Sequence, residues 1–209
     1  MTDLDVTARA RGVQPALIAI GGPPGSGKTT LSRRLAAAWH LPWLAADHLG
    51  PVIATSPALA DSTVNAYWLA YDVLFALADE LLGLGLSAVL DLNLGWSFQW
   101  QRLDALRQQH PQAQVVPVVL RCPRPTCLAR LGQRYAADPA SNAPPSHFAT
   151  DPRILEVVAF LDRLHRPDAV ELAADQTMDV VYADLTDHLQ RRLRSEGSAS
   201  RAAHPPPGR

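Results

Sequence analysis

The chain has 209 residues, of which 47% are hydrophobic and 19% are charged, and its formal net charge is −1 at pH 7. This composition is typical of a globular domain with a sizeable apolar core, and it excludes an intrinsically disordered protein. Because the charges nearly cancel, the sequence offers no broad basic surface, and we expect no nucleic-acid partner.

No segment has the length and apolarity of a membrane span, because the nearest one, residues 76–94, is interrupted by three acidic residues. Residues 1–14 contain charges and no apolar core, which predicts a flexible leader rather than a secretory signal. Cys122 and Cys127 are too few for a disulfide framework. We therefore expect a cytoplasmic protein without a membrane partner, and the sequence indicates no obligate protein partner.

The hydrophobic pattern alternates between short apolar runs and longer segments with helical spacing. The short runs predict strands over residues 16–20, 43–46, 87–92, 114–120 and 169–172. The longer segments predict helices over residues 31–39, 63–82, 97–109, 126–134, 154–164 and 178–193. Residues 50–61 and 136–151 are predicted to be loops, and residues 195–209 a disordered tail. Strands that alternate with helices predict an α/β protein whose parallel sheet is covered on both faces.

The most specific motif follows the first predicted strand and satisfies the pattern G-x-x-x-x-G-K-[ST]. Its glycines allow several backbone N–H groups to face one phosphate, and the helix that follows adds the positive end of its dipole. Lys28 is expected to reach the β and γ phosphates, and the Thr29 hydroxyl to join the shell of a Mg²⁺ ion. The predicted nucleotide-binding residues are Gly22, Pro23, Pro24, Gly25, Ser26, Gly27, Lys28, Thr29 and Thr30.

Two aspartates follow or end predicted strands, at the edge of a parallel sheet where ligands bind. Asp47 follows the second strand and is predicted to orient an attacking hydroxyl group and accept its proton. Asp91 ends the apolar run Val89-Leu90 and is predicted to hold Mg²⁺. The two roles can be exchanged, or both aspartates can face the acceptor. In either position an aspartate can also serve only to stabilise a turn.

Arginines and aromatic residues complete the set of candidate site residues. Arg130 and Arg134 lie four residues apart, hence on one helix face, and are predicted to stabilise the charge that develops in phosphoryl transfer. The alternative is that they face solvent. Trp96 follows a strand end and is predicted to line an acceptor pocket beside Asp91. Further aromatic residues at helical spacing belong either to this pocket or to the core, namely Tyr67, Trp68, Tyr71, Phe98 and Trp100.

The motif at residues 22–30 and the aspartates Asp47 and Asp91 occur together with a segment that contains Cys122-Pro123, Leu128-Ala129-Arg130 and Arg134. This combination resembles the P-loop kinases of small molecules, an AAA-type ATP-binding group. It is most similar to the kinases that include zeta toxins, chloramphenicol phosphotransferase and the kinase part of polynucleotide kinase.

The resemblance implies a P-loop NTPase fold over residues 15–194, with a five-stranded parallel sheet in the order 2-3-1-4-5 and a small lid over about residues 124–151. It also implies transfer of the γ-phosphate of ATP, with Mg²⁺, to a hydroxyl group of a small molecule. Asp47 matches the general base of these kinases, and Arg130 and Arg134 match their lid arginines. Residues 50–61 match no substrate motif, so the identity of the acceptor does not follow.

Three other functions compete with a small-molecule kinase. A nucleoside or nucleotide kinase needs arginines to grip an acceptor phosphate, and residues 50–82 contain none. A GTPase is disfavoured because no Asn-Lys-x-Asp segment occurs. A non-catalytic ATP-binding module is the third alternative, and the presence of Lys28, Thr29, two aspartates and the lid arginines in one chain argues against it. We therefore predict an ATP-dependent phosphotransferase with an alcohol group as acceptor.

Overall fold

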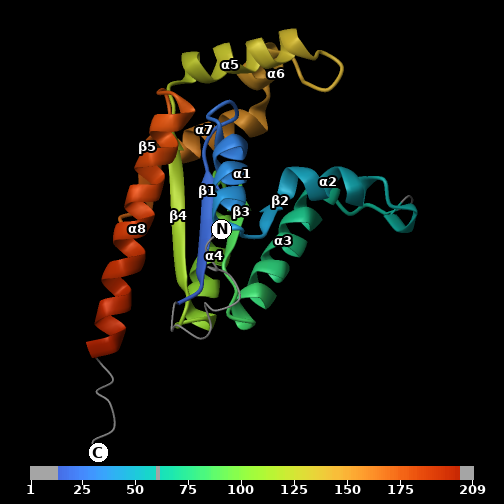
Figure 1. Cartoon of the computed structure of the whole chain (residues 1–209). Coiled ribbons are helices and arrows are strands. Elements are labelled where there is room, and N and C mark those ends of the chain that lie inside the picture. Colours follow the sequence, from blue (N-terminus) through green and yellow to red (C-terminus); the bar gives the residue numbers. More distant parts are fainter. Residues whose placement is uncertain (1–13, 60–61, 203–209) are drawn as a thin grey trace, which may run out of the picture.

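The computed structural model describes residues 14–59 and 62–202 of the chain (Figure 1). The strands are β1 (Ala16–Gly21), β2 (Trp43–Ala45), β3 (Ala88–Asp91), β4 (Gln114–Arg121) and β5 (Val170–Ala173). The helices are α1 (Lys28–Trp39), α2 (Ala46–Ala54), the 3-10 helix η2 (Pro57–Leu59), α3 (Ala66–Gly83), α4 (Ser97–Gln109), α5 (Arg124–Ala137), α6 (Pro145–Thr150), α7 (Pro152–Arg163) and α8 (Met178–Ala202). Except for Gln14, the predicted leader lies outside the described residues. Among the described helices, none combines the length and the hydropathy that crossing a membrane requires.

The five strands form one sheet in the order β2-β3-β1-β4-β5, in which every neighbouring pair is parallel. This confirms the predicted order 2-3-1-4-5 and the P-loop NTPase-like fold. Strand β1 lies between β3 and β4, so the chain connections on its two sides lead in opposite directions. The loop that follows β1 therefore opens at the point of a parallel sheet where ligands bind.

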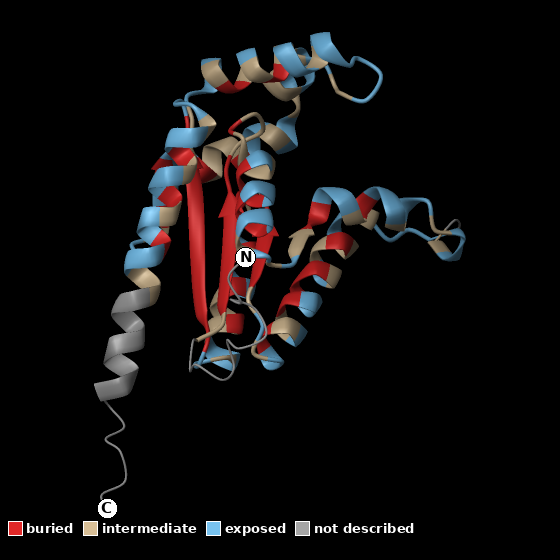
Figure 2. Cartoon of the chain, viewed as in Figure 1, coloured by how far each residue is buried: buried red, intermediate tan, exposed pale blue. Residues whose placement is uncertain are grey.

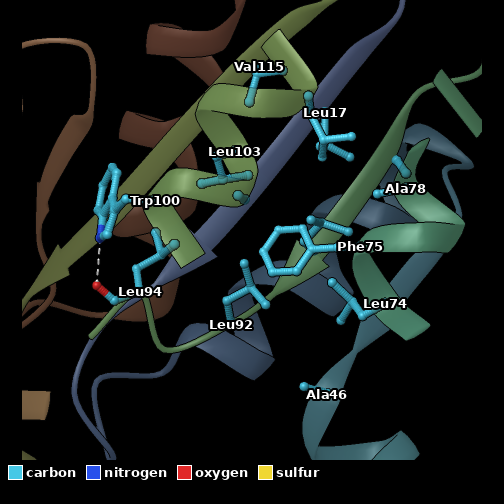
Figure 3. Close-up of a cluster of buried hydrophobic side chains, with 14 of the residues drawn as sticks. Leu17, Ala46, Leu74, Phe75, Ala78, Leu92, Leu94, Trp100, Leu103 and Val115 are labelled. Carbon is cyan, nitrogen blue, oxygen red and sulfur yellow. Dashed lines mark hydrogen bonds between the residues drawn. The ribbon is translucent and has the colours of Figure 1, made fainter. Parts of the chain in front are cut away.

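Both faces of the sheet are covered, since every residue of β1 is buried (Figure 2) and its side chains alternate between two apolar clusters. Leu17 belongs to an apolar cluster with side chains of α3, α4 and α7, part of which is drawn in Figure 3. Ile18 points to the opposite face and belongs to a second cluster with side chains of α1 and α8. A strand buried on both faces cannot shift its register without exposing apolar groups, so the packing fixes the position of the loop after β1.

Helix α2 forms where a loop was expected over residues 50–61, and this prediction is wrong for residues 50–54. Of the rest, residues 57–59 form the short 3-10 helix η2, and residues 60–61 lie outside the described part of the chain. Local propensity disfavours a helix here because Gly50 and Pro51 lie inside it. Tertiary packing supplies the stabilisation instead. A Cβ at Gly50 would lie 2.8 Å from the ring of Tyr67 on α3, so the absence of a side chain allows the two helices to pack closely. Asp47 still follows β2, which ends at Ala45, and it now lies in the first turn of α2.

Two further segments contain more helix than the sequence predicts. The segment 136–151, expected to be a loop, contains helix α6, which begins at Pro145. Helices α5 and α6 lie beyond the carboxyl ends of the strands, where the lid is predicted (Figure 1). Helix α8 continues to Ala202, so the first part of the predicted disordered tail is helical, and residues 203–209 lie outside the described part of the chain. The segment that extends α8 contains no proline, the residue that most strongly ends a helix.

Candidate active site

The loop between β1 and α1 has the backbone of a phosphate-binding loop. Gly25 and Gly27 have φ angles of 84° and 94°, in the left-handed region that glycine adopts without strain. The N–H group of Ser26 donates to the carbonyl oxygen of Pro23 at 3.1 Å, which closes a tight turn. Gly27 is the N-cap of α1, and Lys28 and Thr29 occupy its first turn. The loop therefore exposes backbone N–H groups at the positive end of a helix, as an anion site requires.

A cavity of about 370 Å³ opens beside this loop. Its lining residues come from the loop itself, from α5 and from the segment that precedes α8. They are Gly25, Gly27, Lys28, Thr29, Thr30, Arg130, Leu131, Arg134, Gln176, Thr177 and Met178. Five of the predicted phosphate-binding residues, Gly25, Gly27, Lys28, Thr29 and Thr30, and both predicted lid arginines thus line one cavity. The segment 176–178 was not singled out in the sequence, because no local motif marks it and only the path of the chain after β5 brings it to the loop.

Gly25 provides a test of how the loop is built. A Cβ at this position would lie 2.5 Å from the carbonyl oxygen of Cys127 on α5, and its φ angle is positive. We expect Gly25→Ala to lower the free energy of unfolding by at least about 1–2 kcal/mol, since left-handed strain and a backbone clash add up. The same substitution should also weaken nucleotide binding. Urea unfolding and calorimetric titration with ADP and Mg²⁺ measure the two effects.

Gly132 is the matched control for this variant. It lies inside helix α5, where an added Cβ meets only Pro145 Cγ at an ordinary distance of 3.5 Å. Gly132→Ala should therefore leave nucleotide binding unchanged and stabilise the protein by about 0.5–1 kcal/mol through helix propensity. Equal effects of both variants would contradict a specific requirement for glycine in the loop.

The two lid arginines have different surroundings. Arg130 donates hydrogen bonds from its guanidinium group to the carbonyl oxygens of Ala174 and Gln176, at 2.6 and 3.1 Å. These contacts tie α5 to the segment that precedes α8. The side chain of Arg134 is exposed, and within the described part of the chain it makes no hydrogen bond or ion pair. Of the two, Arg134 therefore has the freer guanidinium group beside the cavity.

Asp91 ends β3 and lies between the ends of two other strands, because Ile20 of β1 and Ala45 of β2 are its partners in the sheet. Its side chain is 6% exposed, and Oδ1 is buried without a hydrogen-bond partner among the described residues. Burial raises the pKa of the carboxyl group, while Lys28 and the hydroxyl group of Thr29 oppose the rise. A buried carboxylate with a free oxygen next to these two residues is suited to a cation.

Asp47 is exposed in the first turn of α2. Its charge contributes to the raised pKa of Asp91 and, after burial, to the raised pKa of Tyr71 on α3. The three side chains therefore interact electrostatically, although the chain separates Asp47 from Asp91 by a whole helix. The structure brings both predicted aspartates to the carboxyl ends of the neighbouring strands β2 and β3. Their environments are unequal, because Asp91 is buried and Asp47 is open to solvent.

Four of the aromatic side chains form a cluster beside the aspartates. The ring of Trp68 lies 5.7 Å from that of Trp96 and 5.2 Å from that of Phe98, and Tyr71 lies 5.5 Å from Phe98, each pair edge to face. Trp68 is 45% exposed. We call Trp68, Tyr71, Trp96 and Phe98 the aromatic cluster. Trp96, the residue predicted to line the acceptor pocket, contacts Trp68 and is half-buried.

Trp100 does not belong to this cluster. It is buried in the core, where its indole N–H donates to the carbonyl oxygen of Leu94 at 2.9 Å (Figure 3). Asn93 was not singled out in the sequence and links the cluster to the loop. The side-chain Nδ2 of Asn93 donates to the hydroxyl group of Tyr71, and its backbone carbonyl oxygen accepts from the N–H group of Gly22. Its place two residues after Asp91, on the same turn, is the signal that could have identified it.

Comparison with solved structures agrees with the fold. Three solved structures that share the fold are a candidate kinase from Chloroflexus aurantiacus J-10-fl, a gluconokinase from Sinorhizobium meliloti 1021 and a sugar kinase from Janibacter sp. HTCC2649. Their TM-scores are 0.60, 0.60 and 0.57, with sequence identities of 22%, 19% and 19%. The alignments cover 85%, 89% and 85% of this chain and 97%, 98% and 95% of those chains. At such identities the likeness shows the fold alone.

Sequence comparison identifies the family. No curated protein shows significant sequence similarity to the chain. The family model of the AAA domain, however, matches residues 17–156, which include the phosphate-binding loop, both aspartates and both lid arginines. Because this match covers more than half of the sequence, the chain belongs to the AAA domain family.

Proposed function

We propose that the protein is an ATP-dependent kinase that transfers the γ-phosphate to a hydroxyl group of a small molecule. The observation that carries this proposal is the pair of unequal carboxylates beside the phosphate-binding loop. Asp91 is buried next to Lys28 and Thr29, and Asp47 is exposed beyond it. A kinase that acts on an alcohol uses one carboxylate toward the metal and another toward the attacking oxygen.

The residues around Asp91 fit a Mg²⁺ ion. The fit rests on the buried Oδ1, which lacks a hydrogen-bond partner among the described residues, and on the neighbouring hydroxyl group of Thr29. Both are oxygen ligands of the kind that Mg²⁺ prefers, and it usually keeps several water molecules as well. We propose that Asp91 and Thr29 hold the ion. When bound, Mg²⁺ would neutralise charge on the β and γ phosphates.

The cationic side chains supply the remaining charge stabilisation in this proposal. Lys28 lies at the start of α1 and would contact the β and γ phosphates. Arg134, free beside the cavity, would reach the phosphoryl group in transfer, where charge spreads over its oxygens. Arg130 would contribute from a fixed position, since its guanidinium group is held by carbonyl oxygens on the opposite side of the cavity.

Asp47 has the features that a general base needs. It is exposed, so an acceptor can approach it, and it lies beside the carboxylate proposed to hold the metal. In this arrangement Asp47 would orient the attacking hydroxyl group and accept its proton. Two of the similar structures are a gluconokinase and a sugar kinase, which supports a small hydroxyl compound as acceptor. From the sequence motifs we propose a closer relation to the group that includes zeta toxins, chloramphenicol phosphotransferase and the kinase part of polynucleotide kinase.

The direct test is release of ADP from Mg-ATP in the presence of hydroxyl-bearing compounds. The panel should contain sugars, polyols, nucleosides, nucleotide sugars and antibiotics, and the phosphorylated product should be identified by mass spectrometry. We expect one class of acceptor to stimulate ADP release, with one phosphate transferred per ADP formed. Tight nucleotide binding without transfer to any acceptor would instead favour the non-catalytic binding module.

Asp91→Asn should stabilise the nucleotide-free protein and reduce its stabilisation by Mg-ADP. Because burial raises the pKa of Asp91 in the folded protein, its ionised form costs stability at pH values above the pKa of the unfolded chain. We therefore expect Asp91→Asn to increase the free energy of unfolding of the nucleotide-free protein at pH 8. The gain should disappear below about pH 4, where the unfolded chain also binds the proton. The variant should also lose the stabilisation that Mg-ADP gives to the unmodified protein.

Urea unfolding at both pH values, with and without Mg-ADP, measures all of these effects. A variant that is less stable than the unmodified protein at pH 8 would show that attraction to Lys28 outweighs the cost of burial. A variant stabilised normally by Mg-ADP would remove Asp91 from the proposed metal shell.

A further inference from the structure

The acceptor side of the proposed active site differs sharply in charge from its nucleotide side. Between Arg34 and Arg102 the sequence contains no lysine or arginine. This stretch builds α2, α3, β3 and the start of α4, and it contributes Asp47, Asp91 and the whole aromatic cluster. The positive charges around the site therefore come from the phosphate-binding loop, from α5 and from the segment after it.

Most arginines near the lid are already engaged. Arg130 binds carbonyl oxygens after β5, and Arg124 donates to the carbonyl oxygen of Ala149 at 2.8 Å. On the acceptor side, Arg102 forms an ion pair with Asp72 at 2.7 Å. Each of these three guanidinium groups therefore already has a hydrogen-bond partner in the structure, and that of Arg102 is an acidic side chain. Arg134 faces the nucleotide cavity, where it would serve the phosphates.

Arg153 is the remaining cation to consider. It lies one helical turn before Val157, the residue of α7 that packs against Gly95. Its side chain is exposed and forms no hydrogen bond or ion pair within the described residues. Arg153 is thus the arginine best placed to bind an anionic acceptor. An Arg153 variant therefore belongs in any test of the charge of the acceptor.

The aromatic cluster offers a different kind of contact. The indole of Trp68 is 45% exposed, although its ring contacts three aromatic neighbours. Tyr71 joins the cluster to the end of β3, because its hydroxyl group accepts a hydrogen bond from the amide Nδ2 of Asn93, two residues after Asp91. Asp47 lies on α2, which packs against Tyr67, the residue before Trp68 on α3. An acceptor whose hydroxyl group reaches Asp47 would therefore lie close to the exposed ring of Trp68. Aromatic faces of this kind stack with flat apolar surfaces.

We infer, on the basis of the proposed function, that the acceptor carries no negative charge and stacks a flat apolar face on Trp68. The exposed carboxylate of Asp47 and the absence of lysine and arginine from α2 and α3 disfavour an anionic acceptor, because like charges placed together oppose binding. The flat face can be the C–H face of a sugar ring or an aromatic ring. A sugar acid or a phosphorylated acceptor would lack a partner for its anion on the walls built by α2 and α3.

Matched pairs of compounds test the charge. D-Glucose and D-glucuronate share one ring and differ in a CH₂OH group replaced by a carboxylate, and 1-phenylethane-1,2-diol and mandelate differ in the same way. Binding of each compound should be measured by calorimetry with Mg-ADP present. We expect the uncharged member of one pair to bind at least about tenfold more tightly than its acid. The pair that binds identifies the apolar face as a sugar or an aromatic ring.

Variants test the contact itself. Trp68→Ala should weaken binding of the uncharged compound about threefold to tenfold, while Trp68→Phe should retain most of the affinity, because the stacking face is kept. Leu77→Ala is the matched control, since Leu77 is 43% exposed on the same helix but about 13 Å further along it. Arg153→Ala should leave binding of the uncharged compound unchanged.

The outcomes separate this inference from the proposed function. Tighter binding of the acids, lost in Arg153→Ala, would overturn the inference and leave the kinase proposal standing. Absence of binding by both members of both pairs would also overturn it. Binding of the uncharged member through Trp68, without phosphate transfer from Mg-ATP to that compound, would support the inference and count against the kinase.

Discussion

Lys28→Ala is expected to lower the rate of phosphoryl transfer by on the order of 10³-fold or more, because a positioned cation stabilises the charge that develops on the transferred group. Lys28 opens α1 and lines the cavity beside the phosphate-binding loop. The loss should appear mainly in kcat, since the backbone N–H groups of the loop still bind the nucleotide. Single-turnover transfer to the acceptor, with calorimetric measurement of Mg-ADP binding, separates the two effects.

The control is Arg33→Ala on the same helix. Arg33 carries the same charge, but its guanidinium group lies over the ring of Trp43, 5.2 Å from the centroid, and it does not line the cavity. Its removal should change the net charge of the protein equally and leave the transfer rate within about twofold, because exposed charges contribute little. Unchanged turnover in Lys28→Ala would overturn the proposed function as a whole.

Asp47→Asn is expected to lower kcat by at least about a hundredfold, the usual contribution of a general base, with little change in the affinity for Mg-ADP. The amide keeps the size of the side chain but cannot accept the proton of the acceptor. Measurement of kcat over pH, together with nucleotide binding, tests this assignment. If the affinity for Mg-ADP collapses and the rate falls with it, Asp47 belongs to the metal shell and the roles of Asp47 and Asp91 are exchanged.

Asp72→Asn is the matched control for this variant. Asp72 follows Tyr71 on α3 and carries the same charge, but it is bound to Arg102 at the surface. Its neutralisation should alter kcat by less than about threefold, since exposed ion pairs are weak. A large effect of Asp72→Asn would show that the general negative potential near α3, rather than Asp47 itself, controls the rate.

Short-range patterns in the sequence were sufficient for the phosphate-binding loop. Its nine residues are contiguous, and the apolar run before them and the helix after them determine its geometry, so one local motif specifies strand, loop and helix. The alternation of strands and helices likewise predicted a parallel sheet. The order of its strands came from the resemblance to P-loop kinases, because no local pattern states which strands are neighbours.

Helix α2 shows where local patterns were insufficient. Gly50 and Pro51 predict a loop, yet the contact between Gly50 and the ring of Tyr67 on α3 stabilises a helix. Propensity differences amount to about 1 kcal/mol for glycine, which packing against a second helix readily exceeds. Asp47 follows a strand as predicted, but the helix that carries it was not predicted.

The sequence by itself determined which residue types could carry the chemistry, and the tertiary structure decided their environments. Asp47 and Asp91 look alike in sequence, but only Asp91 is enclosed by neighbouring strands. Trp96 and Trp100 lie four residues apart, yet one joins the aromatic cluster and the other enters the core. Burial and charge depend on contacts between segments far apart in the chain, and local spacing does not encode those contacts.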